Sequence, residues 1–165
     1  MRIIAALNAQ SAGLGEVMGE HFDRHPAAEI YLSQGLGVVL ASRVMSEFGD
    51  DKTRFADASA RKNYSRAKPI TRASGRKTIV LARYATNRRL GAALHMQAYA
   101  ALTGSPGARA YYDTIRSRGI SHHAALRQLA NRLVGILHGC LKTGSLYDEN
   151  TAWQHRQTDT HVAAA

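Results

Sequence analysis

The sequence contains a single cysteine, Cys140, and only 3 prolines among its 165 residues. A lone cysteine cannot close an internal disulfide, which is typical of proteins that fold in a reducing compartment. The sequence also lacks any run of about 18 apolar residues, which excludes a conventional transmembrane helix. The five apolar residues of positions 3–7 are too few for a secretory signal. We therefore expect a cytoplasmic protein with no membrane partner.

Acidic residues are scarce in the middle of the chain. Lys and Arg number 22 against 12 Asp and Glu, which gives a net charge of +10 and a pI near 10.3. From Arg61 to Arg89 there are ten basic residues and no acid. An exposed protein face normally mixes both signs of charge. The asymmetry therefore indicates a polyanionic partner, DNA or RNA, and an association with the nucleoid.

The remaining composition, with 45% hydrophobic and 21% charged residues, is that of a globular domain. Apolar residues recur at helical spacing along most of the chain, so we expect a mainly α-helical fold. Pro69, Gly75 and the β-prone run 78–80 favour a loop with a short strand or hairpin within residues 68–81. The expected helices cover residues 3–22, 27–32, 38–48, a short segment ending at 64, 87–104, 106–119 and 121–139. The expected N-caps are Asp57 or Ser59 for the short segment, and Ser105 and Ser121 for the last two helices.

Two glycines separate the second expected helix from the third, in the run Gln34-Gly35-Leu36-Gly37. In helix-hairpin-helix elements the first glycine makes the turn, and the second lets a helix N-terminus approach a phosphate. The other interpretation of residues 30–49 is a simple αα-hairpin whose glycines only permit close packing. Both interpretations remain open.

Ser74 lies in the basic stretch, next to Gly75 and among Arg72, Arg76 and Lys77. Cations at this spacing would stabilise charge that builds on a phosphate, so Ser74 is a candidate nucleophile toward a phosphodiester. Such a nucleophile needs a base, and no histidine or carboxylate is close to it in the sequence. The spacing alone favours a turn hydroxyl or a phosphate donor.

The histidines form no recognisable metal motif. His21 and His25 lie four residues apart, but Pro26 follows them and a third ligand is missing. His122 and His123, at an expected helix start, are interpreted as a solvated or phosphate-contacting pair. We expect no metal ion and no other cofactor in this chain.

Several separate motifs, spread over roughly residues 20–153, resemble one known family. They are Gly35-Leu-Gly, Ser74-Gly75, Asn87-Arg88-Arg89-Leu90, the run from Ser105 to Asp113 and the run from His122 to Leu133. Their order and spacing resemble the C-terminal transposase domain of the DEDD insertion-sequence transposases. These are the bridge-RNA-guided recombinases related to the Piv DNA invertase.

The resemblance implies a RuvC-like domain with four acidic metal ligands, followed by a helical connector and then the domain seen here. It implies DNA cleavage by the serine of this domain, which forms a phosphoserine link, in a homo-oligomer with composite sites. DNA and a guide RNA are the implied partners, and Mg²⁺ is expected only in the RuvC-like domain. The chain then divides into the end of the connector (1–25), the transposase domain (26–146) and a frayed tail (147–165).

Carried onto this sequence, the resemblance makes Ser74 the catalytic residue. The residues expected at DNA are Gly35, Gly37, Arg61, Lys62, Arg66, Lys68, Arg72, Gly75, Arg76, Lys77, Arg83, Asn87, Arg88 and Arg89. Gln34 replaces a usual proline, Arg66 replaces a usual glycine, and the RuvC-like domain is missing, so we expect a truncated copy that is inactive alone. Two alternatives are a non-catalytic nucleic-acid-binding module and a helical oligomerisation module whose positive face meets an acidic protein.

Overall fold

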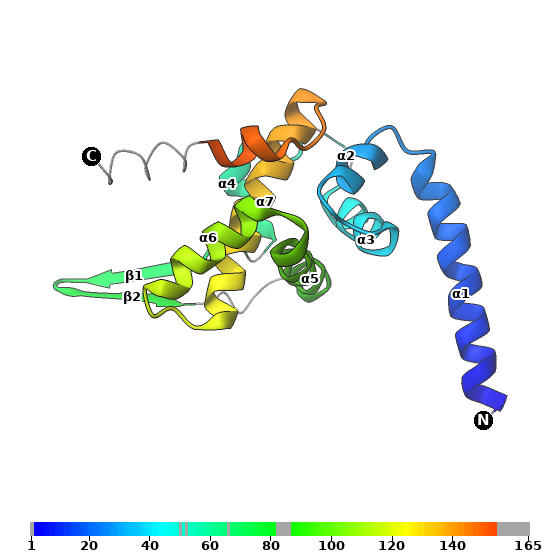
Figure 1. Cartoon of the computed structure of the whole chain (residues 1–165), viewed down its shortest axis with the longest axis horizontal. Helices are drawn as coiled ribbons and strands as arrows, with labels where there is room; N and C mark the ends of the chain where they lie inside the picture. The colour runs from blue at the N-terminus through cyan, green and yellow to red at the C-terminus, as the bar shows by residue number, and fades with distance from the viewer. Residues whose placement is uncertain (1, 50, 52, 66, 82–86, 155–165) are drawn as a thin grey trace.

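The computed structural model is mainly helical, as the sequence predicts (Figure 1). It describes residues 2–49, 51, 53–65, 67–81 and 87–154. In chain order the elements are α1 (Arg2–Asp23), α2 (Ala28–Ser33), α3 (Val38–Phe48), α4 (Ala58–Tyr64), β1 (Ile70–Ser74), β2 (Lys77–Leu81), α5 (Arg88–Gly104), α6 (Pro106–Ser117) and α7 (His122–Thr143). A short helical segment follows at residues 149–154.

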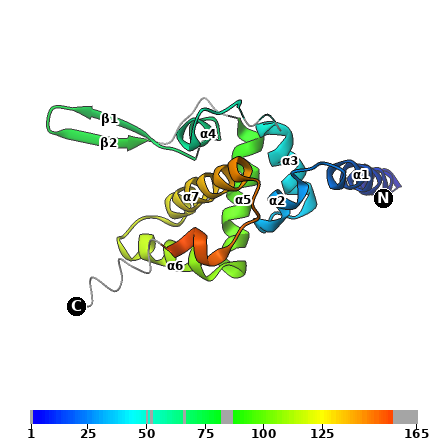
Figure 2. The ribbon, with the colours of Figure 1, turned by 90° about the horizontal axis from the view of Figure 1, so that it is seen from above.

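The centre of the body is the pair α5 and α7, with α3, α4 and α6 packed against one or both of them (Figures 1 and 2). The apolar stripes of the two helices meet there. Their largest buried members, each at most 1% exposed, are Leu90, Leu94, Leu126, Leu129 and Leu137. Burying one such side chain stabilises the fold by about 1.5–3 kcal/mol. The stripes visible in the sequence therefore form the core.

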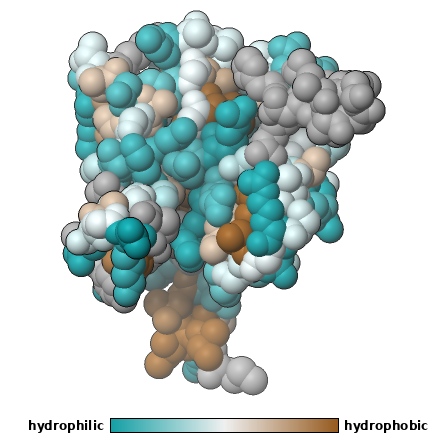
Figure 3. Space-filling model, turned by 90° about the vertical axis from the view of Figure 1, so that its left-hand side faces the viewer, coloured by the Kyte–Doolittle hydropathy of each residue, from teal (hydrophilic) through white to brown (hydrophobic). Residues whose placement is uncertain are grey.

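Helix α1 projects from the body, and only its C-terminal part packs against α2 and α3. Phe22 is buried, and the Met18 sulfur accepts a hydrogen bond from the Ser42 hydroxyl at 3.2 Å. Figure 3 shows apolar side chains gathered on the projecting end, at the bottom of the view. They are Ile3, Ile4, Leu7, Leu14 and Val17, between 52% and 77% exposed. Among the helices that the structure describes, none is long and apolar enough to cross a membrane.

The second projection is an antiparallel hairpin of β1 and β2, which extends away from the helices (Figures 1 and 2). Its register pairs Ile70 with Leu81 and Ser74 with Lys77, so two residues, 75–76, form the turn. Gly75 has a φ of +56°, a conformation that glycine adopts without steric cost. The hairpin predicted within residues 68–81 is confirmed.

Side-chain caps begin two helices at the predicted places. Asp57 accepts a hydrogen bond from the backbone N–H of Ala60, and Ser105 accepts one from that of Ala108. Ser121 precedes α7 as predicted, but its side chain makes no capping hydrogen bond.

The last helix is longer than the sequence predicts. Its expected end at Gly139 is wrong, because Leu137 and Cys140 keep the apolar face buried across that position. The helix ends instead at Gly144, whose φ of +71° is the left-handed conformation typical of a C-terminal glycine.

The predicted fraying from residue 147 onward is wrong for residues 147–154, which dock on the body. Glu149 accepts hydrogen bonds from the backbone N–H of Gly107 at 2.7 Å and from the Ser105 hydroxyl at 2.8 Å. Trp153 is 4% exposed and covers Gly107. The sequence predicts fraying because the segment is mostly polar. The buried side chain of Trp153 nevertheless anchors the segment to the body.

A Gly107→Ala variant should be less stable than the wild type by about 1–3 kcal/mol, the usual cost of overpacking. A Cβ at Gly107 would lie 2.3 Å from Cγ of Trp153, so the docked segment would have to move. Gly139→Ala is the matched control, because a Cβ there meets nothing within 4 Å and alanine is favoured in a helix by about 1 kcal/mol. Thermal unfolding followed by circular dichroism checks both variants. Equal midpoints for Gly107→Ala and the wild type would contradict the docking.

Candidate nucleic-acid interface

The exposed hairpin carries Ser74 at its tip. Cross-strand partners in an antiparallel pair share a face, and successive residues in a strand alternate between faces. Ser74 therefore shares a face with Lys77, directly opposite, and with Arg72, two residues earlier. All three residues are exposed. A phosphate on this face would meet two cations and one hydroxyl at once.

The turn and the base of the hairpin extend this positive surface. Arg76 is exposed in the turn beside Gly75. Lys68 precedes β1 and donates a hydrogen bond from Nζ to the Ser59 hydroxyl at 2.7 Å. Of the residues predicted at DNA, the structure therefore places Arg72, Gly75, Arg76 and Lys77 on the projecting hairpin and Lys68 at its base.

Arg61 is a correction, since the structure places it in the core and not at the DNA surface. Its side chain is 2% exposed, and its guanidinium carbon lies 4.9 Å from the ring centre of Phe48 and 4.7 Å from that of Phe55. Burial lowers the pKa of Arg61. Cation–π contact with two rings stabilises the guanidinium where it is. A side chain so placed cannot reach a phosphate backbone.

Two more of the predicted DNA-binding residues make contacts within the protein. Lys62 is half-buried beside Gly135 of α7, and burial followed by the charge of Arg132 lowers its pKa. Asn87 caps α5 by accepting a hydrogen bond from the backbone N–H of Leu90 at 3.1 Å, and its amide donates to the carboxylate of Glu47. Neither side chain belongs to the hairpin surface.

The remaining arginines of the prediction fall on different sides of α5. Arg88 borders a pocket at the base of the hairpin, whereas Arg89 borders a hollow between α1 and α3. Arg66 and Arg83 lie outside the described residues.

The two glycines between α2 and α3 take the conformations that a tight connection needs. Gly35 has a φ of +72°, and Gly37 is the extended N-cap of α3. Gln34, at the position of a usual proline, is buried and donates a hydrogen bond to the sulfur of Cys140 at 3.4 Å. The turn is thereby fixed to α7. Val39, in the first turn of α3, is 53% exposed.

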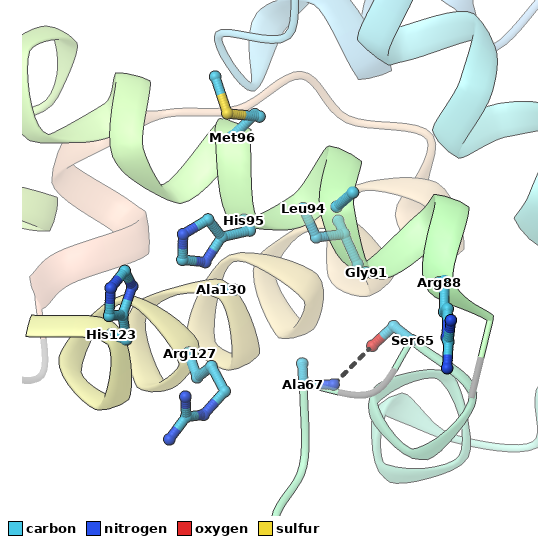
Figure 4. A pocket seen from close by; sticks show the side chains of 11 residues that line it. Ser65, Ala67, Arg88, Gly91, Leu94, His95, Met96, His123, Arg127 and Ala130 are labelled. Atoms are coloured by element: carbon cyan, nitrogen blue, oxygen red, sulfur yellow. Dashed lines mark hydrogen bonds between the residues drawn. The ribbon is translucent and has the colours of Figure 1, made fainter. Parts of the chain in front are cut away.

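A pocket of about 620 Å³ lies between α5 and α7, beside the base of the hairpin (Figure 4). Arg88 and His95 come from α5, His123 and Arg127 come from α7, and Ser65 follows α4. The rings of His95 and His123 lie nearly parallel, with an interplanar angle of 28° and centroids 6.0 Å apart. The sequence predicts His123 as a possible phosphate contact, but no sequence pattern connects it with His95 or Arg127. The missing information is which faces of the two helices meet.

The surroundings of His95 in this pocket disfavour its protonated, charged form in the free protein. Burial lowers the pKa of His95, and the nearby His123, His122 and Arg127 lower it further. The imidazole therefore stays neutral to a lower pH than usual unless an anion arrives beside it.

The described part of the chain contains no group of three or more His, Cys, Asp or Glu that could hold a metal ion. Mg²⁺ prefers carboxylate oxygens, and no carboxylate lines the pocket among the described residues. These residues do not fit a magnesium site.

Residues 29–113 match the family described as "Transposase IS116/IS110/IS902 family". Curated relatives are similar over more of the chain. The "Mini-circle putative transposase for IS117" of Streptomyces coelicolor is 48% identical over 141 residues, which are 85% of this chain and 34% of that protein.

Two further relatives are also products of insertion elements. The 42 kDa protein of IS900 from Mycobacterium paratuberculosis is 32% identical over 90% of this chain and 38% of its own length. The 43.6 kDa protein of IS110 from Streptomyces coelicolor is 30% identical over 88% of this chain and 36% of its own. The chain spans about a third of the length of these relatives.

Proposed function

The chain belongs to the IS116/IS110/IS902 family of transposases, and we propose that it is the DNA-binding part of an insertion-sequence transposase in which Ser74 is the nucleophile. The observation that carries the proposal is the exposed hairpin face that combines Ser74 with Arg72 and Lys77. Cations on both sides of a hydroxyl hold a phosphodiester where that hydroxyl can attack it.

The proposed step is a transesterification at phosphorus. Oγ of Ser74 forms a bond to the phosphorus, and the bond from phosphorus to one deoxyribose oxygen breaks, which leaves the DNA covalently attached to the hairpin. The serine proton passes to a base, and the departing oxygen takes a proton from water. Arg72 and Lys77 stabilise the charge that builds on the non-bridging oxygens.

The base is proposed to come from outside this chain. Every described Asp, Glu and His lies in the helical body or in α1, whereas Ser74 lies at the tip of the projecting hairpin (Figures 1 and 2). The family resemblance supplies carboxylates from a RuvC-like domain, where Mg²⁺ would also bind. By itself the chain is then proposed to bind DNA without cleaving it.

Two other features of the chain fit this role. The exposed apolar residues on α1, from Ile3 to Val17, suit a helical connector that packs against further parts of the transposase. The turn between α2 and α3 is proposed as a second phosphate contact, in which Gly37 exposes the N-terminus of α3. A guide RNA and a homo-oligomer belong to the same proposal and rest on the resemblance.

The experiment that tests the proposal is fluorescence-anisotropy binding of the chain to duplex DNA and to structured RNA, titrated from about 50 to about 200 mM salt. We expect tight binding at low salt and a steep slope of log K against log salt, near 0.9 for each phosphate contact on duplex DNA. An acidic protein partner would give salt-sensitive binding without preference for nucleic acid. Absence of nucleic-acid binding at low salt would contradict the proposal.

A further inference from the structure

The pocket beside the hairpin is not used by the proposed cleavage step. Ala67, which precedes β1, and Arg88, which begins α5, both line it, so the pocket lies close to the base of the hairpin. Its volume of about 620 Å³ falls in the usual range of small-molecule sites, about 300–1,000 Å³. The pocket therefore has room for a nucleotide.

The walls of the pocket are cationic. Arg88 and Arg127 contribute guanidinium groups, and His95 and His123 contribute imidazoles; Figure 4 shows the two rings side by side near Arg127. Within the described part of the chain, no acidic residue lines the pocket. Groups of one sign around a hollow concentrate an anion there.

The floor of the pocket is apolar. Leu94, Ala67 and Ala130 are buried there, and Met96 is 51% exposed at the side. A nucleobase presents an apolar face to such a surface, and a base must leave its stack before it can enter a concave site. An apolar floor with cationic walls matches a single nucleotide better than the uniform backbone of a duplex.

We propose that this pocket binds one unpaired nucleotide of a nucleic-acid strand, with its base against Leu94 and Ala130 and its phosphate beside His123 and Arg127. The proposal rests on the nucleic-acid binding proposed above and adds a subsite and its ligand. A DNA strand and an RNA strand share this chemistry, so the experiment compares the two.

Binding at this subsite takes up protons. In the free protein burial, and after it the neighbouring His123, His122 and Arg127, lower the pKa of His95; a bound phosphate adds a negative charge nearby and raises that pKa again. A third imidazole, that of His122, lies next to these two. It is held from α6 by Tyr112, whose hydroxyl lies 2.6 Å from Nδ1 of His122. Affinity therefore rises as pH falls through the pKa that His95 has in the complex, by at most about tenfold per pH unit.

The test is anisotropy binding of the whole chain to a short oligothymidylate, an oligouridylate and a duplex, from about pH 8 to about pH 6. A His95→Gln/His123→Gln variant removes both imidazoles of the pocket and keeps polar side chains. His21→Gln, in the exposed last turn of α1, is the matched control. We expect the wild type and the control to bind a single strand several-fold more tightly at the lower pH, and the double variant to lose most of that gain.

The outcomes separate this proposal from the proposed function. An unchanged pH profile in the double variant, with nucleic-acid binding intact, overturns the subsite and leaves the proposed function standing. Equal pH dependence on duplex and single strand in the wild type overturns the assignment to an unpaired nucleotide. Failure of the wild type to bind any nucleic acid overturns both proposals. The more pH-dependent of the DNA and RNA arms identifies the strand.

Discussion

A Ser74→Ala variant is expected to form no covalent protein–DNA product, while its affinity for DNA stays close to that of the wild type. The change removes the oxygen that forms the bond to phosphorus, and a methyl group cannot replace it. Arg72 and Lys77 remain on the same face and continue to hold the phosphate. The substitution should therefore affect the cleavage step and not DNA binding. No other single substitution in the chain should reduce the amount of covalent protein–DNA product as much.

The measurement uses the chain joined to a RuvC-like domain, with labelled DNA and a denaturing gel that retains only covalent adducts. Thr71→Ala is the matched control, because Thr71 carries an exposed hydroxyl on the same strand but on the opposite face. We expect Thr71→Ala to form the adduct. An adduct in Ser74→Ala would refute Ser74 as the nucleophile. Loss of the adduct in both variants would show that an intact hairpin, and not one hydroxyl, is required.

The features that the sequence predicts well act over a few residues. Asp57 and Ser105 cap helices through backbone groups three residues ahead. Gly75 makes a turn with its own backbone, and the β-prone residues beside it pair across that turn. Because each of these effects is local, the mainly helical fold and the hairpin could be predicted without knowledge of the tertiary structure.

The features that the sequence does not predict depend on distant partners. Arg61 belongs to a basic run in the sequence, but unlike the hairpin residues of that run it is buried, because it packs against Phe48 and Phe55. Trp153 holds the polar tail because it lies over Gly107. In both cases an aromatic ring from another segment decides the position of the residue, and local composition carries no sign of it.

The pocket shows the same limit for a candidate site. His95 and Arg127 lie on separate helices, and each looks like an ordinary surface residue in its own helix. The crossing of α5 and α7 brings them to one hollow beside the hairpin (Figure 4). The acid-free stretch from Arg61 to Arg89 indicated a polyanion partner, but the arrangement of the charges into a hairpin face and a pocket required the fold.

Replacing Arg72, Arg76 and Lys77 together by alanine should flatten the salt dependence of DNA binding. Each lost phosphate contact lowers the slope of log K against log salt by about 0.9, so the triple variant should lose up to about 3 units. The three side chains are exposed on a projecting element, and their removal should leave the thermal midpoint unchanged. Anisotropy titrations of duplex DNA over salt, with a melting curve for each variant, measure both quantities.

A second triple variant separates local contacts from net charge. Arg2, Arg24 and Arg43 are also exposed, but they lie on α1, at its end and on α3, away from the hairpin. Replacing them removes the same charge from the molecule and should leave most of the slope in place. Equal slopes in the two variants would mean that overall charge, and not the hairpin, governs the affinity. An unchanged slope in the hairpin variant would take the hairpin, and with it Ser74, out of the DNA interface.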